Sequence, residues 1–221
     1  RGRLLAFVDA EIVARLTRHL ETLGLKFIFN DRMASIEVNN SQVQLNLQSG
    51  TTSKFDIALI AAGRQSNVHN LGLEAIGVNV GHRGLVVVNN KYQTNIPNIY
   101  AAGDVIGFPA LASTSMEQAR VAMVHAFDLH YKEKISSILP LAVYGIPEIS
   151  AVGYSEEECK ERGMAYLVGR AAFENSARGQ ISGETIGMVK LIFSPDDKRL
   201  LGAHIIGEGA SELIHIAMHA I

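Results

Sequence analysis

A glycine and an aspartate follow directly after a short apolar segment near the middle of the sequence. Residues 98–102 read Asn-Ile-Tyr-Ala-Ala, and Gly103 and Asp104 come next. In α/β sheets, ligands bind beyond the carboxyl ends of the strands, where glycine lets the backbone approach closely. A carboxylate at that point can accept a hydrogen bond from a sugar or ribityl hydroxyl. The alternative is that Asp104 only forms a turn or a cap.

A second apolar segment ends in a similar way upstream. Residues 55–62 form a continuous apolar run that predicts a strand covered on both faces. Gly63 and Arg64 follow it, and Arg64 is expected to form an ion pair. Downstream, residues 113–130 predict a helix that begins with the capping-box pattern of Thr114 and Glu117.

Together, these segments resemble the two late flavin motifs of the disulfide-reductase-like family of FAD- and NAD(P)-dependent flavoproteins. The resemblance continues through Pro147–Ile149 and Gly202–Gly207, which are similar to that family's interface domain, and it covers essentially the whole chain. It implies an α/β plus α+β fold. Partial Rossmann-like nucleotide-binding units would be followed by an α+β dimerisation domain with an antiparallel sheet.

The resemblance also implies roles for individual residues. Asp104, after Gly103, would bond the ribityl chain of FAD, and the backbone of Leu111 and Ala112 would face the pyrimidine edge of the flavin. The positive end of the helix that begins there would face the charge of the reduced flavin. Gly63 would lie where the nicotinamide nucleotide, NAD or NADP, approaches. The family further implies a homodimer or a larger homo-oligomer.

Within the family, the sequence between the motifs is most similar to the transhydrogenase branch, whose members move a hydride between NADPH and NAD through FAD. Residues 111–113 read Leu-Ala-Ser, where dihydrolipoamide dehydrogenase typically has Leu-Ala-His. That enzyme remains the alternative within the family. A second alternative is a non-catalytic dimerisation module. A third is an unrelated α+β binding protein, which would lack Rossmann-like strand order near residues 55–63 and 99–104.

The organisation of the chain follows from apolar periodicity and turn residues. We expect the back half of an NAD(P)-binding domain at 1–63, the final segment of an FAD-binding domain at 64–136, and most of a dimerisation domain at 137–221. The expected helices are 9–23, capped by Asp9, then 155–163, capped by Ser155, and 210–221. The expected strands are 26–30, 34–38, 42–47, 85–88, 99–102, 142–144, 150–152, 166–173, 188–193 and 200–206, with a turn at 39–41.

Composition restricts the function further. The formal net charge is −2, and aromatic residues are few, so a nucleic-acid partner has little support. No apolar run reaches the roughly 18 residues of a membrane helix, and the single cysteine suits a reducing cytoplasm. The chain begins with Arg1 and ends in an apolar helical stretch. No Gly-x-Gly-x-x-Gly fingerprint occurs in a strand–turn–helix context, and we expect a piece of a longer protein. The resemblance implies that the family's redox cysteine pair and its catalytic His-Glu pair would lie outside these residues, so we expect no catalytic residue within them.

Three further patterns have ordinary explanations. Gly207 and Gly209 resemble half of a dinucleotide fingerprint, but the third glycine is missing, which favours a structural turn. His215 and His219 are spaced i, i+4, but interface packing is expected rather than a metal. Cys159 lies among glutamates, which raise a thiol pKa, so no redox role is expected.

Overall fold

The computed structural model describes residues 2–39 and 42–221. The chain divides into two compact units, one of Arg1–Ala58 with Ile138–Ile221 and the other of Leu59–Ser137. Among the residues described, no helix is long and apolar enough to cross a membrane.

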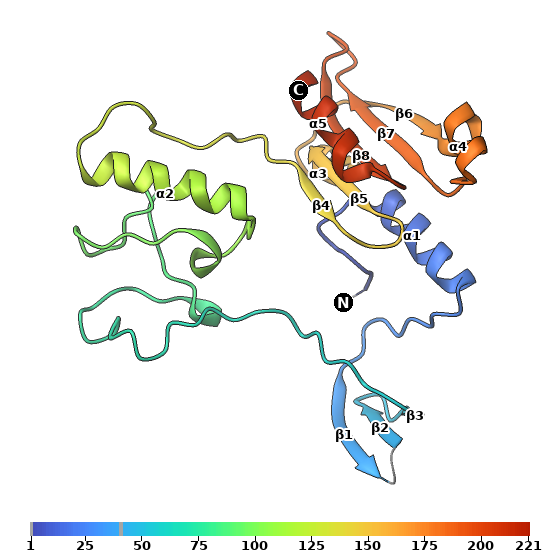
Figure 1. The fold of residues 1–221 in the computed structure, drawn as a ribbon, viewed down its shortest axis with the longest axis horizontal. Coiled ribbons are helices and arrows are strands. Elements are labelled where there is room, and N and C mark those ends of the chain that lie inside the picture. The colour runs from blue at the N-terminus through green and yellow to red at the C-terminus, as the bar shows by residue number, and fades with distance from the viewer. Residues whose placement is uncertain (1, 40–41) are drawn as a thin grey trace. The chain divides into compact units, whose positions relative to one another are not determined.

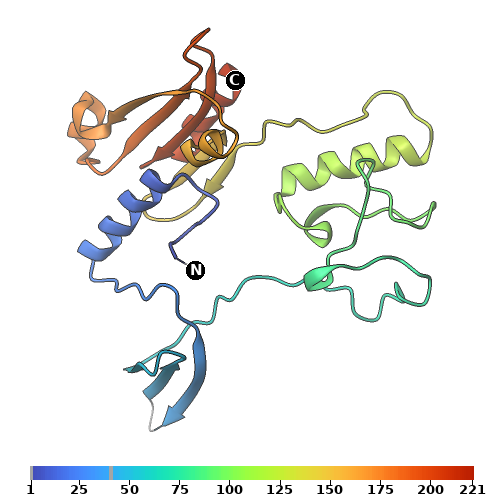
Figure 2. The same cartoon turned by 180° about the vertical axis from the view of Figure 1, so that it is seen from behind.

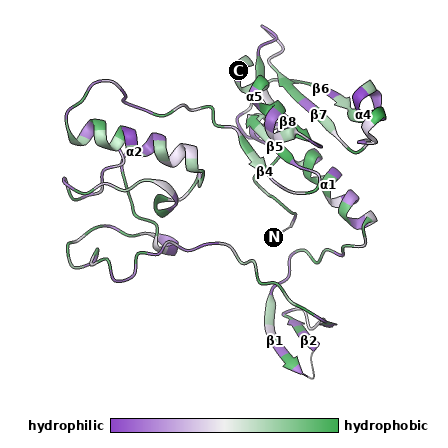
Figure 3. Cartoon of the chain, in the orientation of Figure 1, coloured by the Kyte–Doolittle hydropathy of each residue, from purple (hydrophilic) through white to green (hydrophobic). Residues whose placement is uncertain are grey.

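The first unit is built around a five-stranded antiparallel sheet with the strand order β4-β5-β8-β7-β6 (Figure 1). The strands at the centre of this sheet and helix α5 are mainly hydrophobic (Figure 3). The elements of this part are α1 (Ala10–Thr22), β4 (Leu141–Val143), β5 (Ile149–Gly153), α3 (Glu156–Glu161), β6 (Leu167–Ala172), α4 (Ala177–Ser182), β7 (Met188–Phe193), β8 (Leu200–Ile206) and α5 (Ala210–Ala220).

Helices cover both faces of this sheet, as the two opposite views show (Figures 1 and 2). Successive side chains of a strand point to opposite faces. On β8, Ala203 and Ile205 pack in one core cluster with Ile214 of α5. The next residue, Ile206, packs in another cluster with Ile12 of α1. The sheet is therefore enclosed between α1, from the start of the chain, and α5, from its end.

A buried charged cluster lies on the α1 face of the sheet. Lys190 of β7 has a side chain that is 1% exposed, and its Nζ lies 2.8 Å from Asp9, 3.0 Å from Glu11 and 2.5 Å from Glu156. His204 faces Lys190 across the β7–β8 pairing and is also buried. Asp9 is at the same time the N-cap of α1 and accepts two backbone N–H groups of its first turn. The cluster therefore ties the beginning of α1 to the sheet.

The cluster shifts the pKa values of its members. Burial alone favours neutral forms, but hydrogen bonds with the carboxylates outweigh it and raise the pKa of Lys190 above 10.5. Burial is likewise outweighed at Asp9, where the bond from Lys190 lowers the pKa below 3.8. Burial lowers the pKa of His204, which keeps its ring neutral at pH 7. The stabilisation from Asp9 is thus complete above pH 3.8 and is lost as the pH falls through its lower folded pKa.

A small three-stranded antiparallel sheet also belongs to the first unit. It consists of β1 (Met33–Asn39), β2 (Gln42–Leu47) and β3 (Thr52–Phe55) in that order. The expected hairpin strands 34–38 and 42–47 are therefore confirmed. Residues 40 and 41 of the expected turn lie outside the described residues.

The second unit contains one long helix, α2 (Ala112–Ala126), and two 3-10 turns, His82–Gly84 and Gly103–Ile106. Loops join these elements, and backbone hydrogen bonds tie the loops to one another. One such bond runs from Val86 N–H to the carbonyl of Val105 at 2.9 Å. The buried side chains of α2 include Val121 and Val124. The unit therefore carries the Gly103–Asp104 segment and the helix expected beside it on one small scaffold.

Several sequence predictions of strands are wrong. A strand needs a neighbour for its hydrogen bonds, and among the described residues these segments have at most isolated bridges, such as Val80–Val86 and Gln93–Tyr100. In the second apolar run, Leu59 is 90% exposed rather than covered. The segments affected are 26–30, 55–62, of which only Phe55 lies in a strand, 85–88 and 99–102.

The expected capping box of the long helix is also wrong. Helix α2 begins at Ala112, and its N-cap is Leu111, which makes no side-chain capping bond. Thr114 is instead buried inside the first turn. Glu117 forms ion pairs with Arg120 and Lys132. The expected caps Asp9 and Ser155 are confirmed, and Ser155 forms a full capping box with Glu158.

The buried cluster generates the first prediction. Lys190→Met leaves the buried Asp9 without its cation, while Glu11 and Glu156 keep Arg170. We therefore expect it to lower the free energy of unfolding by about 3–5 kcal/mol. Adding Asp9→Asn to that variant should recover part of the loss, because asparagine keeps the cap but removes a charge. Urea unfolding followed by circular dichroism measures both.

The matched control is Lys160→Met, which removes an exposed lysine 4.0 Å from Glu156 and should cost less than about 0.5 kcal/mol. Equal losses for the two lysine variants would contradict a structural role for the buried cluster.

Candidate functional site

The Gly103–Asp104 pair lies in a 3-10 turn that follows an extended segment. Gly103 is buried and has a φ of +82°, a conformation that L side chains rarely adopt. A Cβ at this position would lie 3.1 Å from the Oγ of Ser115 in α2. Glycine is therefore favoured here both by the backbone angle and by the close approach of the helix.

The beginning of α2 exposes backbone donors. Its N-cap, Leu111, has no side chain able to accept from the first-turn N–H groups. Leu111 is half-buried, and Ala112 is exposed. The first turn therefore offers N–H groups and the positive end of a helix dipole to an acceptor or a negative charge. A flavin pyrimidine edge, with its carbonyl and ring nitrogen acceptors, fits this donor set.

Asp104 is partly exposed and carries one ion pair. The side chain is 44% exposed, and its Oδ2 lies 3.0 Å from Nη1 of Arg64. Arg64 directly follows Gly63, which is exposed and has a φ of +97°. The ion pair thus brings the segment after Gly63 next to Asp104. The exposed part of the carboxylate can still accept a hydrogen bond from a ligand hydroxyl, which fits a ribityl chain.

A buried glutamine connects the turn to the helix. The side-chain oxygen of Gln118 accepts the N–H of Gly103 at 2.7 Å, and Gln118 is 3% exposed. Sequence reasoning missed this residue, because a polar residue in the middle of a helix usually faces solvent. Its position one turn after Thr114, on the same face of the helix, is the signal that could have identified it. The expected site residues Gly103, Asp104, Leu111 and Ala112 therefore belong to one bonded assembly.

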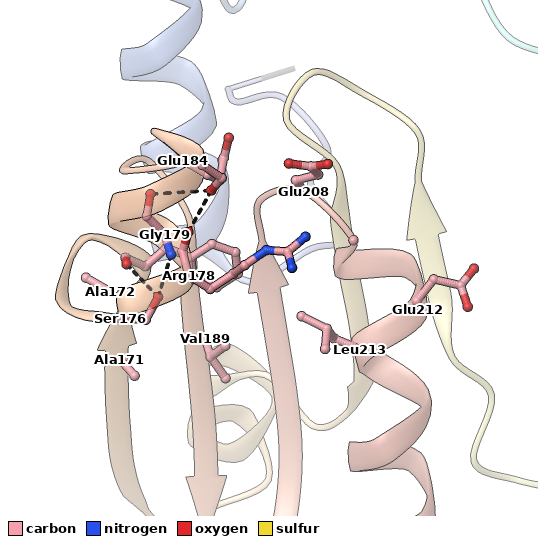
Figure 4. Close-up of a pocket in the computed structure, with 13 residues that line it drawn as sticks. Ala171, Ala172, Ser176, Arg178, Gly179, Glu184, Val189, Glu208, Glu212 and Leu213 are labelled. Atoms are coloured by element: carbon pink, nitrogen blue, oxygen red, sulfur yellow. Dashed lines mark hydrogen bonds between the residues drawn. The ribbon is translucent and has the colours of Figure 1, made fainter.

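A separate hollow lies in the first unit, between α4 and the beginning of α5 (Figure 4). It has a volume of about 540 Å³. Its walls include the apolar residues Phe173, Val189 and Leu213, and Arg178 extends across it toward Glu208. It contains none of the residues that the sequence predicts for cofactor binding.

The remaining sequence candidates have structural explanations. Gly207 donates its N–H to the carbonyl of Glu148 at 2.9 Å, and Gly209 is the N-cap of α5, so both form a turn. Burial, reinforced by Glu158 and Glu156, raises the pKa of the Cys159 thiol. Among the described residues, no group of three His, Cys, Asp or Glu side chains could hold a metal ion.

Comparison with known proteins agrees with this architecture. The model of the pyridine nucleotide-disulphide oxidoreductase family matches residues 1–126, and the dimerisation-domain model of the same family matches residues 139–221. The chain belongs to this family. The expected fold class is therefore confirmed, and the family match excludes an unrelated α+β protein although strands near 55–63 and 99–104 are missing.

The chain is also similar to individual curated proteins. The soluble pyridine nucleotide transhydrogenase of Marinomonas sp. is 44% identical over 97% of this chain and 46% of its own length. That of Mycobacterium tuberculosis is 41% identical over 98% of this chain and 46% of its own length. The chain thus spans about half the length of these relatives.

Among solved structures, LpdA from Mycobacterium tuberculosis has a TM-score of 0.87 and 29% identity, over 96% of this chain and 46% of that one. The HOCl-induced flavoprotein disulfide reductase RclA from Escherichia coli has a TM-score of 0.86 and 28% identity, over 97% of this chain and 49% of its own.

The geometry at Gly103 generates the second prediction. Gly103→Ala forces a side chain into a left-handed backbone conformation, which costs about 1–2 kcal/mol, and against Ser115 as well. The control is Gly77→Ala in the same unit, where φ is +75° but nothing lies within 4 Å. Gly103→Ala should therefore lose clearly more unfolding free energy than the control.

Ser115→Gly weakens the helix by itself, so it serves as the reference for the double variant. In that background Gly103→Ala should lose no more than Gly77→Ala does, because Ser115→Gly removes both atoms that the new Cβ would meet. Denaturant midpoints of the four variants measure this. If the two alanine variants lost the same amount, the close approach of α2 to the turn would be wrong.

Proposed function

We propose that the full-length protein, meaning a protein of the relatives' length that contains these 221 residues, is an FAD-dependent enzyme that transfers a hydride between NADPH and NAD. The observation that carries this proposal is the 41–44% identity to soluble pyridine nucleotide transhydrogenases over nearly the whole chain. The geometry around Asp104 and the beginning of α2 supports it, because that geometry fits a flavin.

In this proposal, the chain positions the cofactor. The carboxylate of Asp104 accepts a hydrogen bond from the ribityl chain of FAD, and Arg64 holds that carboxylate through its ion pair. The first-turn N–H groups that follow Leu111 bind the pyrimidine edge of the flavin and stabilise negative charge there. Gly63 leaves space for the nicotinamide nucleotide. The bound flavin supplies the hydride chemistry.

Dihydrolipoamide dehydrogenase is the second candidate within the family. Its redox cysteine pair would have to come from outside these residues, because Cys159 is the single cysteine of this chain and is buried. The Leu-Ala-Ser sequence at 111–113 favours the transhydrogenase. Taken alone, the chain holds only part of each nucleotide site, so we propose that by itself it acts as a non-catalytic dimerisation module.

We also propose that the full-length protein is a cytoplasmic homodimer or larger homo-oligomer. Residues 139–221 match a dimerisation domain. Helix α5 of that domain exposes Leu213 (41%) and Ile216 (71%), and such side chains are suited to burial against a second copy. The domain boundaries that we propose for the function remain 1–63, 64–136 and 137–221.

The third prediction concerns the activity of the full-length protein. We expect a yellow protein with a flavin spectrum that reduces a thio-NAD analogue with NADPH and does not form NADH from dihydrolipoamide. Activity with dihydrolipoamide alone would move the assignment to the disulfide reductases. A colourless, inactive protein would contradict the role of Asp104 as well.

In the same protein, Asp104→Asn should weaken FAD binding by about fivefold to tenfold. The asparagine oxygen still accepts, but a neutral hydrogen bond contributes about 1 kcal/mol less than one to a charged group. Arg64→Met removes only the ion pair and should have a smaller effect. Asp196→Asn, in an exposed turn of the first unit, is the control and should bind FAD like the wild type.

A further inference from the structure

We propose that Gln118 is a positioning residue for the flavin, an inference that rests on the proposed function. The carboxylate of Asp104 and the first turn of α2 would contact different parts of FAD. Gln118 belongs to α2, and its side-chain oxygen accepts the N–H of Gly103, the residue before Asp104, at 2.7 Å. One hydrogen bond therefore links the two cofactor contacts.

The link is buried and tight. Gln118 is 3% exposed, and Gly103 is also buried. A buried backbone N–H needs a partner, and Gln118 is the partner of the Gly103 N–H. Gly103 also begins the 3-10 turn that continues through Asp104. Because Gly103 has no Cβ, Ser115 can lie so close to its backbone that a Cβ there would be crowded. The turn thus rests directly against the helix, and Gln118 fixes their relative orientation.

A second contact supports the same helix at its other end. The hydroxyl of Tyr100 and Nδ1 of His125 lie 2.8 Å apart. The segment that leads into Gly103 is therefore bonded to α2 at two places, at the middle of the helix through Gln118 and near its end through His125. Of these, the bond from Gln118 lies close to the proposed cofactor contacts, so its loss should affect the flavin more than the loss of distant packing.

The experiment uses the full-length protein with FAD bound. Gln118→Met keeps the shape of the side chain but removes its acceptor. We expect the FAD dissociation constant to rise about tenfold, equivalent to 1.4 kcal/mol. We also expect the flavin potential to become more negative, because the N–H groups of α2 no longer align with the anionic reduced flavin.

The matched control is Val124→Ala, which removes buried apolar atoms from the same helix away from the turn. It should lower stability but leave the flavin potential and the FAD affinity near the wild-type values. If Gln118→Met and Val124→Ala changed FAD binding and potential equally at equal loss of stability, Gln118 would have only a structural role and the inference would be wrong.

Gln118→Asn covers the case in which the methionine variant does not fold. Its amide is one methylene shorter and opens the 2.7 Å contact, so FAD binding should again weaken. Wild-type affinity and spectrum in this variant would overturn the inference while leaving the proposed function intact. A wild-type protein that binds no FAD would overturn both.

Discussion

The buried charge of Lys190 is the constraint on which the first unit depends. A lysine that is 1% exposed within a sheet is stable only with carboxylates around it, and Asp9, Glu11 and Glu156 supply them. Because Asp9 also caps α1, the same carboxylate begins the helix and fastens it to the sheet. The ion pairs of Lys190 with Asp9 and Glu11 therefore join the part that the oxidoreductase model matches to the dimerisation domain.

In the second unit, the buried hydrogen bond between Gly103 and Gln118 has the connecting role that the charged cluster has in the first unit. Few regular elements stabilise it, and its loops are connected by backbone hydrogen bonds and isolated bridges. Close approach of α2 to Gly103, with Gln118 as the buried acceptor, makes the turn and the helix one assembly. This assembly fixes the position of Asp104 relative to the first turn of α2, and recognition of a large cofactor requires such fixed positions.

Local signals explain which elements the sequence could predict. The caps Asp9 and Ser155 and the hairpin strands 34–38 and 42–47 depend on neighbouring residues, and these predictions are confirmed. The apolar run at 55–62 is misassigned beyond Phe55, because a strand also depends on a partner and residues 56–62 have none among the described residues. Lys190 and Gln118 were missed because their partners are distant: Lys190 is 181 residues from Asp9. The apolar residues on both sides of Lys190 are the available signal there.

A crystal structure of the full-length protein with FAD would test the central claim most directly. The account predicts that the carboxylate of Asp104 lies within hydrogen-bond distance of a ribityl hydroxyl, and that the first turn of α2 after Leu111 faces the pyrimidine edge. The hydrogen bond between Gln118 and Gly103 should be retained. A flavin bound elsewhere, with Asp104 in contact only with Arg64, would contradict it.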